Sequence, residues 1–294
     1  MIPREARTHE QHDLFGTTQV SCVSWLGVLR GALTAAALLA GVGCGPRLMK
    51  LPSGPGTTAL DIADVHVQSF DACMRIQSLS AEIAAGGSVS GQRFRARLIG
   101  GFTAQATRLE AAAPFGAPLF IFVASNNDAT LLMPRDARVV EHGRPAEVLE
   151  ALTGVALTPS ELLRTLTGCY VPDRLGSPLA YGDLWRSVAG GGGAKIYMHR
   201  ETVSSPWRVV SVFHPGEGLQ PIWRADYDQF ANGLPTVLRL VSLPPGRFNL
   251  ELTLSQVDTN IELKPAVFRV EVPSGIERVT LDEIKRARPG VRED

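Results

Sequence analysis

The chain has 294 residues, of which 45% are hydrophobic and 20% charged, and its 29 lysines and arginines balance 29 aspartates and glutamates. The balanced charge gives no electrostatic case for a nucleic-acid partner, and the four cysteines and six histidines lack zinc-site spacing. No G-x-S-x-G, H-E-x-x-H or phosphate-loop motif occurs, so we expect no enzyme, no cofactor and no metal site.

The N-terminal 43 residues are predicted to be a leader and a secretory signal peptide. After Arg30, an apolar run of roughly a dozen residues ends in small residues and is too short to span a bilayer core. The polar stretch ahead of it is unusual for a signal, so we expect the true start near Val20 or Val23.

Cys44 follows Ala-Gly-Val-Gly, a run of small residues that is typical of a lipobox, although Gly41 stands where leucine is usual. Two interpretations remain: lipid attachment at Cys44, or an ordinary cleaved signal with a chance cysteine. Residues 44–56 are rich in proline and glycine and predict a flexible tether with a reach of roughly 40 Å.

A helix is predicted over Thr57–Ser78, with Thr58 and Asp61 as its caps. Its expected buried face is apolar at helical spacing and comprises Ala63, Val67, Phe70 and Met74.

From Leu79 the hydrophobic period changes to two. Arg93, Arg95 and Arg97 alternate with apolar residues, which predicts either a solvated outer face of a strand or, as the less simple reading, a site for anionic headgroups. Further strands are expected from Gly101 to about Ala113, over Leu119–Ala124, Leu131–Pro134 and Arg138–Glu141.

Two short helices are predicted between Arg144 and Cys169. The first buries Val148, Leu149 and Leu152 and ends at Gly154; the second begins with the capping box Thr158, Pro159 and Glu161, buries Leu162, Leu163 and Leu166, and ends at Gly168. Each helix has one apolar side, so both must lie on something larger. We expect them to form a lid over a sheet.

Beyond Cys169 alternation resumes over 207–213, 221–227, 236–243, 248–254 and 267–272, and Gly190–Gly193 predicts a hairpin. The sum is roughly ten to eleven antiparallel strands. The predicted fold is mainly β (α+β): one strongly curved, half-open β-barrel domain over residues 57–288. A last helix over Leu281–Ala287 and a disordered tail over 289–294 complete it.

Three segments carry a family resemblance: APFGAP at Ala113–Pro118, AEVLEALTG at Ala146–Gly154 and LLRTLTG at Leu162–Gly168. Over residues 79–168 the chain resembles the LolB-like outer-membrane lipoproteins. More broadly it is similar to the half-open-barrel lipid carriers that include LolA and the mycobacterial lipoprotein LppX.

The resemblance implies a non-enzymatic lipoprotein that is anchored to the outer membrane and faces the periplasm. It would bind acyl chains of lipoproteins or lipids and receive them from a periplasmic LolA-like carrier. The loop Pro114, Phe115 and Gly116 would deliver them to the membrane, with Phe115 where the family usually has leucine. From the residues alone, Phe115 either folds into the core or stays exposed.

Inward-facing strand residues are candidates for the acyl cavity: Phe94, Leu98, Phe120, Phe122, Leu250 and Leu252. The same residues would equally fill a packed core, and the rival function is then a structural or assembly lipoprotein that uses the fold as an interaction module. Cys73 and Cys169 remain either a disulfide or two buried thiols.

Overall fold

The computed structural model describes residues 48–113, 115–171, 176–190, 194–215 and 222–287. Its strands are β1 (Thr57–Thr58), β2 (Ser78–Val89), β3 (Gln92–Thr103), β4 (Ala106–Ala112), β5 (Phe120–Ser125), β6 (Asp128–Met133), β7 (Arg138–Gly143), β8 (Leu179–Tyr181), β9 (Trp185–Ala189), β10 (Lys195–His199), β11 (Arg208–His214), β12 (Ile222–Ala231), β13 (Leu234–Leu243), β14 (Phe248–Thr259) and β15 (Glu277–Arg278). The helices are α2 (Ile62–Met74), α3 (Pro145–Thr153), α4 (Pro159–Thr167), α5 (Leu281–Ala287) and the 3-10 helix η2 (Pro265–Phe268).

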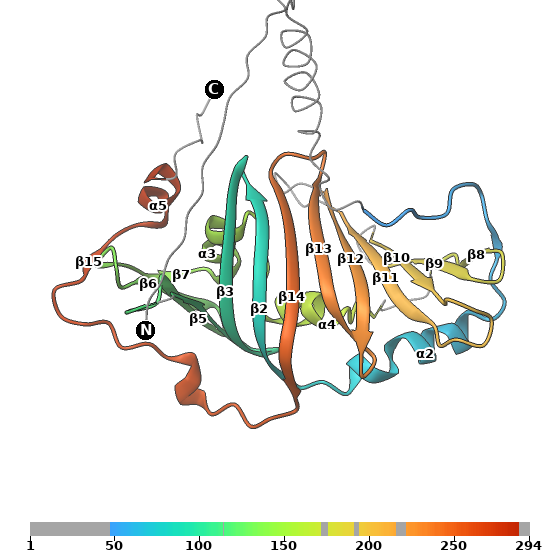
Figure 1. Cartoon of the computed structure of the whole chain (residues 1–294), viewed down its shortest axis with the longest axis horizontal. Coiled ribbons are helices and arrows are strands. Elements are labelled where there is room, and N and C mark those ends of the chain that lie inside the picture. The colour runs from blue at the N-terminus through green and yellow to red at the C-terminus, as the bar shows by residue number, and fades with distance from the viewer. Residues whose placement is uncertain (1–47, 114, 172–175, 191–193, 216–221, 288–294) are drawn as a thin grey trace, which may run out of the picture. The chain divides into compact units, whose positions relative to one another are not determined.

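All fifteen strands belong to one open sheet with the order β1-β8-β9-β10-β11-β12-β13-β14-β2-β3-β4-β5-β6-β7-β15. Every neighbouring pair is antiparallel except β15 and β7, which run parallel. Figure 1 shows α3 and α4 behind the central strands, on the side toward which the sheet curves. The predicted fold class, a strongly curved and half-open β-barrel with a helical lid, is confirmed, with more strands than expected.

The strand register separates the two faces of the central sheet. Ala225, Leu240, Leu250, Gly87 and Phe94 follow one another across five strands and lie on the side of α3 and α4, here called the inner face. The neighbouring row across the same strands comprises Asp226, Arg239, Glu251, Gly86 and Arg95 and defines the outer face.

The hydrophobic core fills the space between the inner face and the helices. Its largest fully buried side chains include Phe70, Phe102, Phe122, Tyr227 and Phe248. Strand residues supply most of this cluster, and α3 and α4 supply the rest. The lid helices are therefore packed on the sheet.

After β14 the chain turns back along the outer side of the sheet. Arg108 of β4 donates hydrogen bonds to the carbonyl oxygens of Val267 (3.3 Å) and Arg269 (3.2 Å), which hold this return segment. The strand predicted over 267–272 is wrong, because its first residues belong to η2 and the backbone there pairs with no strand.

Two other predictions need correction. The strand expected from Gly101 to Ala113 is two strands, because the chain reverses between Thr103 and Ala106, where the Thr103 hydroxyl accepts from the Ala106 amide at 2.9 Å. The first helix, α2, is shorter than predicted, and Val67 and Met74 are 66% and 63% exposed. Its buried face is instead Val65, Phe70 and Cys73.

Five strands were not predicted. The strands β8, β9 and β10 extend the sheet beside β11, and the two-residue strands β1 and β15 lie at its two edges. The strands β9 and β10 pair antiparallel, and residues 191–193 of the predicted hairpin lie outside the described part of the chain.

Candidate functional site

The six predicted cavity residues all lie on the inner face. Phe94 and Leu98 lie opposite Gly87 and Ile83 of β2, and Leu250 and Leu252 of β14 flank the same strand. Phe120 and Phe122 of β5 lie opposite Ala111 and Leu109 of β4. Residues from three separated strands thus form one continuous apolar surface.

Burial along this surface is graded. Phe122 and Leu250 are 2% and 4% exposed, whereas Phe94 is 36% exposed. Leu98, Phe120 and Leu252 are partly buried and pack against the core. The apolar surface therefore continues from beneath the helices out to the open end of the β2–β3 hairpin.

The two lid helices form as their local sequence predicts. The Thr158 hydroxyl accepts from the Glu161 amide, and the Glu161 carboxylate accepts from the Thr158 amide at 2.8 Å, which completes the capping box. Gly154 and Gly168 end the helices with φ of 81° and 69°, a region that glycine enters without strain. Leu162, Leu163 and Leu166 are buried, as predicted.

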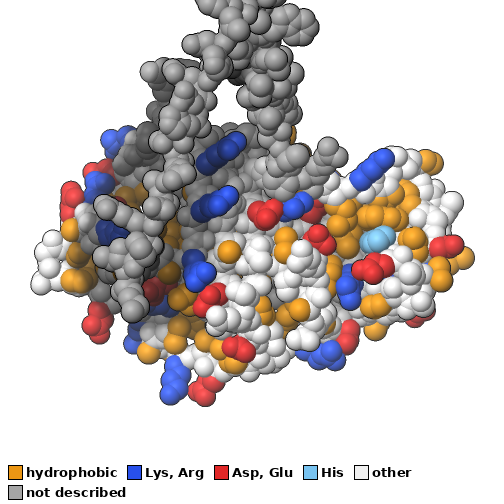
Figure 2. Space-filling model, in the orientation of Figure 1, with side chains coloured by type: hydrophobic (Ala, Val, Ile, Leu, Met, Phe, Trp, Pro, Cys, Tyr) orange, Lys and Arg blue, Asp and Glu red, His pale blue; other side chains and the backbone are white. Residues whose placement is uncertain are grey.

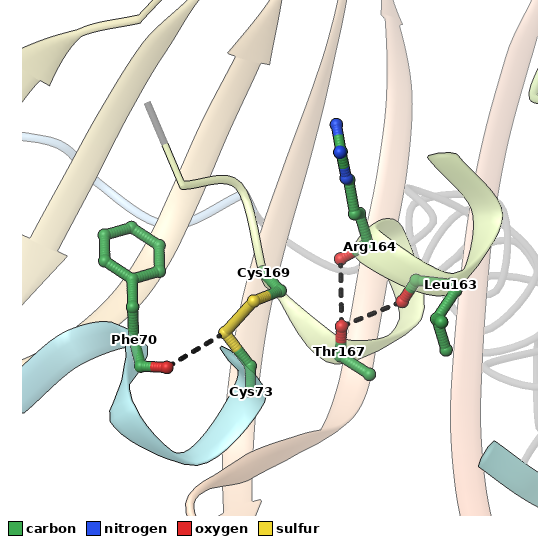
Figure 3. Close-up of a disulfide and its surroundings, with 6 residues drawn as sticks. All are labelled: Phe70, Cys73, Leu163, Arg164, Thr167 and Cys169. Carbon is green, nitrogen blue, oxygen red and sulfur yellow. Dashed lines mark hydrogen bonds between the residues drawn. A yellow bond between two sulfur atoms is a disulfide. The ribbon is translucent and has the colours of Figure 1, made fainter. Parts of the chain in front are cut away.

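A disulfide joins Cys73, in the last turn of α2, to Cys169, immediately after α4 (Figure 3). The two Cα atoms lie 5.5 Å apart, within the range that a disulfide spans without backbone movement. Of the two readings of these cysteines, the structure contains the bonded pair. It ties the end of the lid to a helix that packs on β11.

The predicted delivery loop carries an exposed aromatic side chain. Phe115 is 88% exposed, and Gly116 has φ of 79°, with no described atom beyond its chain neighbours within 4 Å of where a Cβ would lie. Arg135 donates hydrogen bonds to the carbonyl oxygens of Phe115 (2.8 Å) and Ala117 (3.2 Å). The loop backbone is therefore held at one side by Arg135, while Phe115 projects away from the core. Pro114 lies outside the described residues.

A buried ion pair that sequence reasoning missed lies on the outer face. Arg224 and Asp226 have side chains that are only 10% and 6% exposed, with nitrogen and oxygen 2.6 Å apart. The Ser211 hydroxyl also donates to Asp226, at 2.7 Å. The Met49 amide donates to Asp226 at 2.9 Å, and the Met49 carbonyl accepts from Arg224 at 2.5 Å. Met49, inside the predicted tether, is therefore clamped to the sheet.

A second ion pair fixes the start of α2. Arg186 of β9 donates to both oxygens of the Asp61 carboxylate, at 2.8 and 2.7 Å. These hydrogen bonds lower the pKa of Asp61 below its usual value. Asp61 occupies the N-cap position but makes no side-chain cap, so the predicted capping role is wrong and the carboxylate binds β9 instead.

Aromatic and polar side chains gather beside the disulfide. His214 stacks on Trp223 with ring centroids 3.8 Å apart, and Tyr170 meets His214 edge-on at 4.4 Å. Burial lowers the pKa of His214 to about 4 and raises the pKa of Tyr227 well above its usual value. Among the described residues, the buried His214 Nε2 and Tyr227 hydroxyl atoms have no hydrogen-bond partner.

None of four hollows found among the described residues is lined by any of the six cavity candidates. In this part of the chain no group of three histidine, cysteine or acidic side chains is arranged to hold a metal ion. Its helices are all too short or too polar to span a bilayer. Cys44, the predicted lipid attachment site, and the predicted leader and tail lie outside the described residues.

No protein-family model matches the sequence, and no curated protein matches it significantly. A LolA superfamily protein from Nitrosomonas europaea has a similar structure, with TM-score 0.49 and 14% identity over 73% of this chain and 98% of that one. A DUF1329 family protein from Desulfovibrio piger has TM-score 0.47 and 10% identity over 70% of this chain and 95% of that one. A putative outer-membrane lipoprotein-sorting protein domain from Vibrio parahaemolyticus has TM-score 0.44 and 10% identity over 70% and 94%. Each of these three matches covers at least 94% of the other chain and at least 70% of this one.

Proposed function

We propose that this protein is a lipid-anchored lipoprotein of the cell envelope, bound to the outer membrane through Cys44 and facing the periplasm. It binds acyl chains of lipoproteins or lipids on the inner face and delivers them to the membrane, after receiving them from a periplasmic LolA-like carrier. The graded apolar surface is the observation that carries this proposal. It runs from Leu250, beneath the lid, to the partly exposed Leu98 and Phe94.

Binding requires the lid to move, because the inner face and the helices are packed together. Lifting α4 exposes Leu162, Leu163 and Leu166, at a cost of about 5 to 9 kcal/mol if each leucine loses about 1.5 to 3 kcal/mol. An acyl chain gains about 0.8 kcal/mol per buried CH2, so about 12 kcal/mol for sixteen carbons. The two terms are of similar size. An acyl chain that takes the place of these leucine side chains can therefore be bound and later released without a catalytic group.

Release to a bilayer uses the loop at the edge of the same end of the sheet. Phe115 is already outside the core, so inserting it into lipid costs no folded contact and gains about 1.5 to 3 kcal/mol. Such an energy brings the protein to a membrane transiently. The exposed aromatic side chain therefore supports a delivery role.

The packed interior also favours a second function. Phe122 and Leu250 are fully covered, and the hollows found among the described residues lie elsewhere. A domain with a filled core would act as an interaction module in an envelope assembly and bind no acyl chain.

Native mass spectrometry with lipid extraction distinguishes the two functions. We would use the complete chain with Cys44→Ser, which has no acyl anchor, purified from cells that contain membranes. The carrier predicts a co-purified acylated molecule, and Leu98→Arg should lose it. The matched control is Ile99→Arg, because Ile99 is the next residue, is 50% exposed and points to the outer face. If the purified protein carries no lipid and takes up no added phospholipid or lipopeptide, the carrier function is excluded and the interaction module is the better proposal.

A further inference from the structure

The outer face carries a row of arginines that have no partner in the part of the chain that the structure describes. Arg93, Arg95 and Arg97 of β3 are exposed, and within the described residues no hydrogen bond or ion pair reaches their guanidinium groups. Other arginines of this face are paired: Arg239 lies 3.0 Å from Glu251, and Arg108 lies 2.9 Å from Glu110. Figure 2 shows Lys and Arg side chains in a row over the long central strands.

The surroundings of this arginine row leave its charge accessible. On β2 the residues opposite the three arginines are Ser88, Gly86 and Ala84, and Ala112 of β4 flanks Arg97 on the other side. Alternate residues of a strand are about 7 Å apart, so three cations line up over about 14 Å above a floor of small residues. Because the whole chain has equal numbers of acidic and basic residues, attraction to an anion here comes from this local row.

The arginine row borders the exposed loop. One shallow groove on the outer face is lined by Arg95, Arg97, Ala113 and Leu119 among others, and Leu119 is 42% exposed. Phe115, two residues beyond Ala113, is the most exposed aromatic side chain described. Cationic and exposed apolar side chains thus share one edge of the surface, the combination found at membrane interfaces.

The hydrogen bonds that hold Met49 to Arg224 and Asp226 lie on the same face. Asp226, which binds Met49, is in the register row that ends with Arg95, four strands away. Cys44 precedes Met49 by five residues, which span at most about 17 Å. An acyl anchor at Cys44 would therefore attach to the bilayer within five residues of Met49, which is bound to this face.

We propose that the outer face is the membrane-docking surface of this protein and that it selects anionic phospholipids. The arginine row binds headgroup phosphates while Phe115 inserts between the acyl chains. Guanidinium groups suit this role because they remain charged and bind phosphate oxygens in pairs. The inference rests on the proposed function for its anchor at Cys44, but its test does not depend on cargo.

Vesicle flotation tests the proposal. The complete chain with Cys44→Ser is mixed with vesicles of phosphatidylcholine alone or with 30% phosphatidylglycerol, at low and high salt. The test variant is Arg93→Gln/Arg95→Gln/Arg97→Gln. The control variant, Arg75→Gln/Arg164→Gln/Lys285→Gln, removes the same charge from three exposed sites, at the C-cap of α2 and on the helices α4 and α5. Any binding by the leader is common to all chains, so the preference for anionic vesicles is the quantity compared.

We expect the test variant to lose about a hundredfold in affinity for anionic vesicles, about fivefold for each arginine, and the control to keep wild-type affinity. Phe115→Ser should lose about tenfold on either vesicle. Equal binding by test variant and wild type, or equal loss in test and control variants, would overturn the proposal. So would tighter binding to an oligoglutamate peptide than to anionic vesicles, which would identify an acidic protein as the partner. Leu98→Arg separates the two hypotheses, since it should lose lipid cargo and keep flotation.

Discussion

Removing the disulfide between Cys73 and Cys169 should destabilise the fold strongly, because the bond closes a long loop. Its cysteines are separated by 96 residues. The chain-entropy relation gives about 4.7 kcal/mol for a loop of this length, and measured losses for native disulfides are about 2 to 5 kcal/mol. For a domain of this size that corresponds to a fall in Tm of about 10 °C.

The assay is urea denaturation of the complete chain, followed by tryptophan fluorescence, for wild type and for Cys73→Ala/Cys169→Ala. The variant should unfold at lower urea, and dithiothreitol should move wild type to the midpoint of the variant. Dithiothreitol should leave the urea midpoint of the variant unchanged, and this result would exclude a contribution of Cys22 and Cys44 to the measured stability. Coincident midpoints for the variant and the oxidised wild type would refute the loop-closure reasoning.

Three other changes test separate features of the fold by the same denaturation assay. Gly87→Ala should lower the free energy of unfolding by well over 1 kcal/mol, because a Cβ there collides with the Asn249 carbonyl. Gly246 has the same φ of 133°, but a Cβ there meets no described atom, so Gly246→Ala should lose only the energy of the backbone strain. Equal losses of stability in the two variants would contradict this reasoning. Asp226→Ala should cost about 3 to 5 kcal/mol, since it leaves the partner guanidinium buried and unpaired, and a loss below 1 kcal/mol would show that the pair is hydrated. His214 has a folded pKa of about 4 against about 6.5 unfolded, so about 3 kcal/mol of stability is present above pH 6.5 and is lost as the pH falls to 4. His214→Phe should flatten that part of the pH profile, and an unchanged profile would assign it to other groups.

The sequence was sufficient to predict features that depend on contacts between residues close together in the chain. Thr158 and Glu161 define the start of α4 because a capping box closes within one turn, and Gly154 and Gly168 end their helices by backbone conformation alone. The alternation of Phe94 and Leu98 with arginines likewise gave the correct two faces of β3. These features need no knowledge of the rest of the fold.

Tertiary contacts decided what sequence reasoning missed. Met74 was expected in the core because it continues an apolar stripe, but Phe70 and the bond from Cys73 fix the rotation of α2 and turn Met74 to solvent. Arg224 and Asp226 look like solvated strand residues in the sequence. In the fold they contact Ser211, the Phe213 ring and Met49, which lies 175 residues or more away in the chain.

In the proposed function, the hydrogen bonds of Met49 and the lid on the inner face would together constrain the route of the acyl cargo. If the outer face rests on the membrane, the lid faces away from it, toward the proposed periplasmic carrier. An acyl chain that enters beneath α4 would then have to pass the open rim at Phe94 to reach the bilayer. Phe94 lies on the inner face of the β2–β3 hairpin, and Arg93 and Arg95 lie on its outer face. The convex side of a curved sheet meets a flat membrane only along its crest. Docking by the arginine row would therefore bring that rim, and Phe115 beside it, to the lipid while leaving the lid free to open.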